Sequence, residues 1–280
     1  MKTLRLGLEG MLPMAGIAVM LCLMLVVEMA SADTGKTYAF PEKFMMRLSY
    51  YSIDSADTKV TALNDIGIGV GYSFSKDFDT DDSVEVPRID IYYRFNERHR
   101  IDFSTFSTDR DGQKALEIEV ELGDTIFSKG EVLNSSISYD LYRLGYSYSF
   151  YHSETVELAV SAGLNVTKYD LEFSNSNGSE REQVDATAPL PMFGLQMGYA
   201  FNSNWSLHYL METFFIEIED TYKGTFFNNE VTIQYRFLDN FLVGLGVARV
   251  GVDLEVDEND WKGEIVDSYD GYLLYTGFYF

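Results

Sequence analysis

The chain of 280 residues contains only three histidines and one cysteine, the side chains most often used as bases, nucleophiles and metal ligands. Ser206 and His208 are separated by one residue, so on an extended strand both point to the same face, where they could act as nucleophile and base. His99 and His152 each fall in a short polar stretch between strand-like segments. Whether this chemistry is usable depends on which end of the fold these residues occupy.

A second set of candidates consists of charged residues within segments that are otherwise apolar. Between residues 88 and 95 the charged side chains share one parity, and Ile89, Ile91, Tyr93 and Phe95 share the other. We predict that the charged parity lines an enclosed polar face and forms ion pairs. The predicted network consists of Arg94, Arg143, Arg236, Asp90, Asp102 and Glu157, with Gln196, Glu212 and Gln234 as further partners.

Acidic stretches are the third candidate, as metal sites. Asp77, Asp79 and Asp81 begin like a calcium loop, but Asp82 replaces the required glycine and Arg88 takes the place of the bidentate glutamate. Seven acids between residues 253 and 267 form a second acidic stretch. We interpret both as solvated surface rather than a dedicated metal site. The net charge of −23 excludes nucleic-acid binding through phosphate neutralisation.

A repeated unit organises the chain. An apolar-alternating strand ends on an aromatic triplet, a short polar turn follows, and a second alternating strand begins. Twenty Tyr and twenty Phe against five Pro fit such an aromatic-rich β protein. The five closing triplets are residues 93–95, 148–150, 199–201, 235–237 and 278–280.

The last strand carries the resemblance to a known class. Tyr272, Leu274, Phe278 and the terminal Phe280 lie on one face of an extended segment. This segment resembles the C-terminal closing strand of Gram-negative outer-membrane β-barrel proteins, which the barrel-assembly machinery reads. The resemblance implies an all-β, antiparallel, up-and-down transmembrane barrel with short periplasmic turns and long outer loops. Five closing triplets predict ten strands, with eight or twelve as alternatives.

Several finer features follow from the same pattern. Residues 60–76 are expected to extend beyond the membrane as part of a loop hairpin, because the acidic run after Phe74 could not face lipid. Residues 116–122, where glutamates alternate with apolar residues, are expected to do the same. The apolar parity switches near Thr167 and near Ala248, which predicts a β-bulge at each position. Residues 188–191, with two prolines, are expected to be a loop that enters a descending strand.

The N-terminus has the layout of a secretory signal peptide. Lys2 and Arg5 precede the apolar run 11–27, and Ala30-Ser31-Ala32 forms a cleavage site. We therefore expect a signal peptide at 1–32 and one barrel domain at 33–280, placed in the outer membrane. Cys22 would be removed with the signal peptide, which excludes disulfides and thiol catalysis in the mature chain.

In this orientation the histidines lie at the periplasmic end, away from outer-leaflet substrates. Ser206 and His208 resemble the Ser/His pair of lipid A deacylases, but at the wrong end, so we expect no enzyme and no cofactor. We predict a structural or surface-interaction protein with a side-chain-filled lumen. A narrow channel for ions or small solutes is the alternative, and a lipid-modifying enzyme the third possibility. Expected partners are outer-membrane lipid or lipopolysaccharide, the assembly machinery, and divalent cations at the acidic loops.

Overall fold

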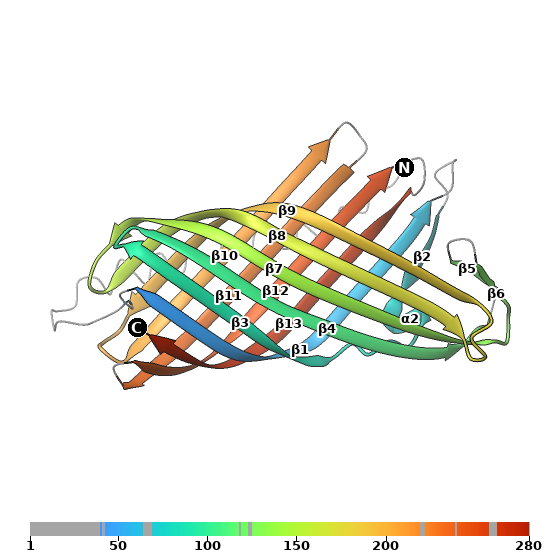
Figure 1. The fold of residues 1–280 in the computed structure, drawn as a ribbon, viewed down its shortest axis with the longest axis horizontal. Helices are drawn as coiled ribbons and strands as arrows, with labels where there is room; N and C mark the ends of the chain where they lie inside the picture. The colour runs from blue at the N-terminus through green and yellow to red at the C-terminus, as the bar shows by residue number, and fades with distance from the viewer. Residues whose placement is uncertain are drawn as a thin grey trace.

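A computed structural model describes Phe40 and residues 43–63, 69–117, 119–122, 125–218, 222–238, 240–257 and 262–279 (Figure 1). The predicted signal peptide and Phe280 lie outside these residues. Strands dominate, and among the described residues no helix is long and apolar enough to cross a membrane. The elements are β1 (Phe44–Leu63), β2 (Gly69–Ser73), α2 (Phe74–Asp77), β3 (Val84–Asn96), β4 (His99–Ala115), β5 (Val120–Leu122), β6 (Thr125–Phe127), β7 (Val132–His152), β8 (Val156–Asn175), β9 (Arg181–Ala200), β10 (Trp205–Ile218), β11 (Tyr222–Leu238), β12 (Phe241–Asp257) and β13 (Lys262–Tyr279).

The strands form a closed antiparallel ring. Neighbours follow the order β13-β12-β11-β10-β9-β8-β7-β4-β3-β1, and β13 also pairs with β1, so ten strands close a barrel. The prediction of ten strands is confirmed. Strand β2 is an eleventh, short strand, and it pairs with residues 59–63 at the C-terminal end of β1. Strands β5 and β6 pair in a separate hairpin. The predicted hairpin that includes residues 60–76 is therefore present, and the second hairpin lies at residues 120–127, only partly overlapping the predicted 116–122.

Short turns gather at one end of the barrel. The aromatic triplets precede the turns that join β3 to β4, β7 to β8, β9 to β10 and β11 to β12. Long strands and the elements β2, α2, β5 and β6 gather at the other end (Figure 1). We call these the short-turn end and the long-loop end.

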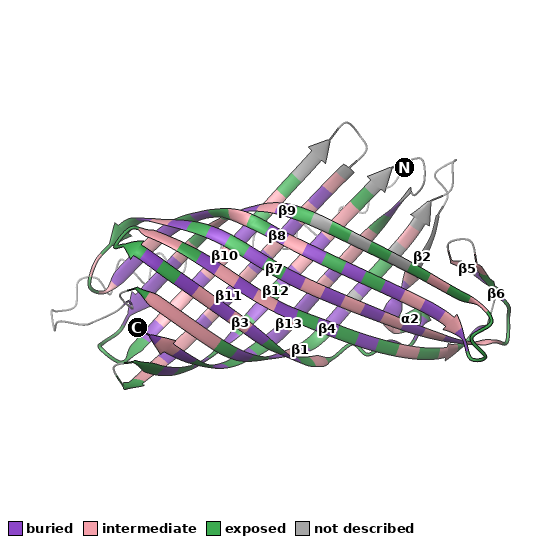
Figure 2. Cartoon of the chain, in the orientation of Figure 1, coloured by how far each residue is buried: buried purple, intermediate pink, exposed green. Residues whose placement is uncertain are grey.

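Along each strand, side chains point alternately to the outer surface of the barrel and to its interior, and Figure 2 shows the resulting alternation of exposed and buried residues. On β12, Phe241, Val243, Leu245 and Val247 face outward and are 40%, 44%, 60% and 50% exposed, whereas the next inward residue, Ala248, is 5% exposed. The outward residues form an apolar band around the barrel. Arg249 follows Val247 on the outer face, so the band ends there.

The two predicted bulges are wrong. The β7–β8 register runs unbroken past Thr167, and the β12–β13 register runs unbroken past Ala248. The apolar parity switches because the inward-facing positions change from polar to apolar towards the long-loop end, and not because the register shifts. Leu171 and Val252 keep the inward parity of their strands and are buried, because the barrel interior is apolar at the long-loop end. The register shifts lie instead near the short turns and at 53–55 in β1.

The proline segment is not a loop either. Pro189 and Pro191 lie inside β9 and pair with Val166 and Leu164 of β8. On its other side β9 pairs with β10 only up to Phe193 and Thr213, and beyond this point the two strands diverge (Figure 1). Proline has no N–H to donate, so the two prolines are tolerated on a strand edge that carries no partner.

An apolar cluster fills the barrel at the long-loop end. Phe74 and Phe78, at either end of α2, contact each other and Phe173 of β8 at ring-centroid distances of 5.3–5.7 Å. The Asp77 carboxylate accepts a hydrogen bond from the Ser73 backbone N–H, which fixes the start of this helix. We call the cluster the outer plug. It consists of Phe74, Phe78, Leu116, Val120, Phe127, Leu133, Ile137, Leu171 and Phe173.

Candidate functional site: the ionic lumen

The predicted polar network lies in the half of the barrel nearer the short turns. Arg94, Asp90, Asp102, Arg143 and Glu157 are all buried inside the barrel, each under 10% exposed. The sixth residue, Arg236, is partly exposed near the short turns, with its guanidinium 4.8 Å from the centre of the Tyr279 ring. Five of the six candidates therefore share one interior, and Arg236 lies at its margin.

Two of the predicted arginines form buried ion pairs across the lumen. Arg94 of β3 contacts Glu157 of β8 at 2.8 Å. Arg143 of β7 donates through Nε to Oε1 of Glu212 on β10 at 2.9 Å. Glu212 is 0% exposed, and it also accepts from Asn228 at 3.1 Å. A carboxylate in such a position requires its cation, because removing charge from water without a partner costs several kcal/mol.

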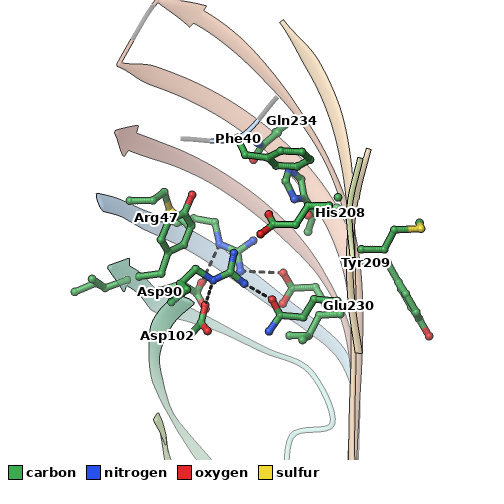
Figure 3. A pocket seen from close by; sticks show the side chains of 18 of the residues that line it. Phe40, Arg47, Asp90, Asp102, His208, Tyr209, Glu230 and Gln234 are labelled. Carbon is green, nitrogen blue, oxygen red and sulfur yellow. Dashed lines mark hydrogen bonds and ion pairs between the residues drawn. The ribbon is translucent and has the colours of Figure 1, made fainter. Parts of the chain in front are cut away.

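Asp90 belongs to a ring of four charges. Arg47 contacts Asp90 at 2.9 Å and Glu230 at 2.8 Å (Figure 3). Arg88 contacts the same two carboxylates, each at 2.8 Å. Ser104 also donates to Asp90 at 2.7 Å. The sequence did not indicate Arg47 or Glu230, and it placed Arg88 on the polar face with Asp90 and Arg94 but not in the predicted network.

The network is electrically balanced. Arg100 pairs with Asp102 at 2.7 Å, which completes the set. Five arginines (Arg47, Arg88, Arg94, Arg100 and Arg143) face five carboxylates (Asp90, Asp102, Glu157, Glu212 and Glu230), so the formal charges cancel. Between these side chains lies a cavity of about 140 Å³, which we call the chamber. This volume holds on the order of ten water molecules.

A smaller polar group lies in the lumen among aromatic rings. Arg110 is 1% exposed and donates to the Thr58 hydroxyl, and Thr58 in turn donates to Asp267 at 2.7 Å. Tyr169 also donates to Asp267, at 2.9 Å. The ring of Tyr139 lies 5.0 Å from that of Tyr169. Thr58 thus links a buried cation to a buried anion, an arrangement that no sequence pattern indicated.

Comparison with solved structures identifies the fold. OmpT, an outer-membrane protease of Escherichia coli, superposes with a TM-score of 0.58 and 11% sequence identity, over 86% of this chain and 98% of OmpT. The chain has the fold of a Gram-negative outer-membrane β-barrel. OprG of Pseudomonas aeruginosa (TM-score 0.37, 10% identity, 87% of this chain and 99% of OprG) and Ail of Yersinia pestis (0.34, 13%, 85% and 99%) also match. No protein-family model and no curated protein matches the sequence.

Two features of the barrel wall show where the hydrocarbon region ends. Outward apolar residues give way to charge between Val247 and Arg249, and pairing of β9 with β10 stops at Phe193. Unpaired backbone groups cannot face lipid hydrocarbon, so the divergent part of β9 must lie beyond it. Asp253 and Glu264, farther along their strands, therefore lie outside the membrane.

All three histidines of the barrel lie at the short-turn end. His99 and His152 flank the first two turns, and His152 lies 3.6 Å from Glu157. The predicted Ser206–His208 pair is real: the Ser206 Oγ and the His208 Nε2 are 3.1 Å apart. His208 lines the chamber rather than an outward surface. His208 is therefore accessible as a base to a molecule inside that cavity, whereas Ser206 does not line it.

Asp77, Asp79 and Asp81, which were predicted to be solvated surface and not a dedicated metal site, are arranged around α2. Asp77 is occupied by the Ser73 N–H, Asp79 adopts a left-handed backbone with φ of 57°, and the Asp81 N–H donates to the Asp111 carbonyl. Within the part of the chain that the structure describes, no group of three or more His, Cys, Asp or Glu residues could hold a metal ion.

The closure residues that the structure describes lie on the outward face of β13. Tyr272 and Leu274 of β13 are 60% and 63% exposed on the outer wall. Phe278 contacts Phe241 of β12 edge to face, with ring centroids 4.5 Å apart. The same strand pairs with both β1 and β12, so it is the strand that closes the ring.

Like charges meet outside the membrane. Glu255 and Glu264 are direct partners across β12 and β13. Partial burial, together with Asp253 and Glu255, raises the pKa of Glu264, and burial with Glu255 raises the pKa of Asp253. A raised carboxyl pKa means that stability is present at low pH and is lost as the pH rises through the folded-state pKa.

Removing this repulsion should stabilise the barrel at neutral pH. We expect Glu264→Gln to raise the free energy of unfolding by about 0.2–1 kcal/mol at pH 8, the usual size of a cross-strand charge effect, and to have no effect at pH 4. Urea unfolding in micelles at both values measures it. Glu172→Gln is the control of opposite sign, because Glu172 contacts Arg181 at 2.7 Å. An equal gain at both pH values would contradict the assignment.

Proposed function

We propose that this protein is a non-conducting outer-membrane barrel of structural or surface-interaction type, exported through its N-terminal signal peptide. The observation that carries the proposal is the filling of its interior. The ionic lumen, the group around Arg110 and Asp267, and the outer plug are distinct sets of buried side chains that share one barrel interior. Ten strands leave room for little more than their own side chains.

The charge pattern of the lumen supports the same proposal. An ion-selective pore presents a ring of one sign that is free to meet the ion. Here each of the five arginines contacts a carboxylate, so neither sign is in excess. Ion pairs of this kind hold the strands of a narrow barrel together, and they leave the chamber electrically neutral.

The outer surface supports an interaction role. The net charge of −23 and the exposed acids at the long-loop end favour cationic partners or divalent cations. We propose outer-membrane lipid or lipopolysaccharide around the apolar band, with divalent cations between lipid phosphates and acidic loops. The C-terminal strand would be read by the barrel-assembly machinery. No enzymatic activity is proposed, because the Ser206–His208 pair lies inside the short-turn end of the barrel, away from outer-leaflet substrates.

Planar-bilayer recording tests the proposal. The full mature barrel, reconstituted at high protein density, should give no stable single-channel openings, whereas a known porin in the same preparation provides the positive control. A heat-dependent shift of the same protein preparation on a gel should show that the barrel is folded. Reproducible openings would overturn the filled-lumen proposal in favour of the narrow channel. In that case Arg94→Gln and Arg143→Gln should change ion selectivity.

A further inference from the structure

Phe40 precedes the first strand but is only 8% exposed. Its ring centroid lies 5.7 Å from that of His152 and 6.2 Å from that of His208, the latter at an interplanar angle of 83°. Figure 3 shows the Phe40 ring next to His208 and close to Gln234. The ring is therefore held inside the short-turn end of the barrel and not on its rim.

A recess in the barrel wall accepts this ring. Phe40 packs with Ala200 in a cluster of their own, and Gly198 lies directly beneath the ring. A Cβ atom on Gly198 would come within 2.3 Å of the Phe40 Cε1 atom. Any larger residue at 198 would thus exclude the ring. The recess consists of His152, Gly198, Ala200 and His208.

The recess opens into the chamber. Phe40 and His208 both line it, alongside charged residues such as Arg47 and Glu230. An apolar ring therefore lies against a cavity whose other walls carry buried ion pairs. A smaller side chain at position 40 would therefore enlarge the chamber towards the short-turn end.

We propose that the recess is a binding site for an aromatic side chain and that its partner is Phe40 of the same chain, which closes the chamber at the short-turn end. Phe40 lies four residues before β1, so its effective concentration at the recess is high and no second molecule is needed. The glycine and alanine that shape the recess match the thickness of one ring. Exchange of water and small solutes between the chamber and the periplasm then depends on release of Phe40.

Thiol labelling in the chamber tests this directly. Thr232 lines the chamber and is 3% exposed, and the sole native cysteine can be removed as Cys22→Ser. In this background, Thr232→Cys should react slowly with a small water-soluble methanethiosulfonate in the full barrel. Adding Phe40→Ala should speed the reaction by about 10- to 100-fold, the factor that corresponds to burying one phenylalanine ring.

Three further variants sharpen the test. Gly198→Val keeps phenylalanine at position 40 but fills the recess, so the ring is displaced. Its labelling rate should therefore match that of Phe40→Ala. Phe40→Leu should restore part of the protection. Phe237→Ala removes an exposed aromatic at the same end and should change nothing. Each variant is first shown to be folded by its gel shift. Equal rates with and without Phe40, whether both fast or both undetectable, would overturn the proposal.

Discussion

Replacing Arg143 by methionine is expected to lower the free energy of unfolding by about 3–5 kcal/mol, because it leaves a buried carboxylate without its cation. Glu212 has no exposed surface, and its oxygens are bound by Arg143 and Asn228. Methionine fills a similar volume, so the loss is electrostatic and not a cavity effect. Urea titration of the barrel in vesicles, followed by the gel shift of the folded form, measures the change.

Two variants separate the ion pair from the mere loss of an arginine. The double variant Arg143→Met, Glu212→Gln removes both charges and should recover most of the loss, since neutral replacement of a whole buried pair is often tolerated. Arg236→Met is the matched control, because Arg236 is partly exposed and lies over Tyr279. It should cost less than about 1 kcal/mol. Equal losses at Arg143 and Arg236 would contradict the assigned role of the pair.

The sequence predicted the barrel well because each strand carries its own signal. The triplet at 148–150, the turn after it and the strand that begins at Val156 can each be recognised within about twenty residues, from alternation and turn chemistry alone. Strand count, short-turn positions and the inward parity of Asp102 and Glu157 follow from such local patterns. These features need no knowledge of which strands meet across the lumen.

The pairing of charges across the lumen could not be predicted in this way. Arg94 meets Glu157, 63 residues away, and Arg47 meets Glu230, 183 residues away. Which side chains lie at one level depends on the stagger of all ten strands, and the stagger is a property of the closed ring. Parity identified the residues that face inward, but only closure decides which of them touch.

The misread bulges have a related cause. A switch of apolar parity was taken to mean that the chain shifts by one residue. Leu171 instead stays inward and packs in the outer plug, whose Phe74 and Phe127 come from segments far along the chain. Beyond the hydrocarbon boundary the outer wall faces water and the interior is covered by protein, so polarity reverses across the wall without any change in register.

Gly163 provides the second large expected effect. It faces the interior and lies opposite Gly145 on β7. A Cβ at this position would lie 2.3 Å from the Leu144 carbonyl oxygen and 2.5 Å from the Met192 Cε. The methyl group of Met192 can move, but the backbone oxygen of a paired strand cannot move without breaking the ladder. We expect Gly163→Ala to cost about 2–3 kcal/mol, towards the upper end for overpacking of an interior.

Gly251→Ala is the matched control on the outer wall. There a Cβ would meet only the Asp267 carbonyl oxygen, at 4.0 Å. Because glycine weakens a strand relative to alanine, this variant should be neutral or more stable by up to about 1 kcal/mol. The two variants add the same methyl group to strands of the same barrel, but only Gly163→Ala should lower the urea midpoint. If Gly163→Ala unfolds at the same urea concentration as Gly251→Ala, β7 and β8 do not approach each other as closely as the structure shows.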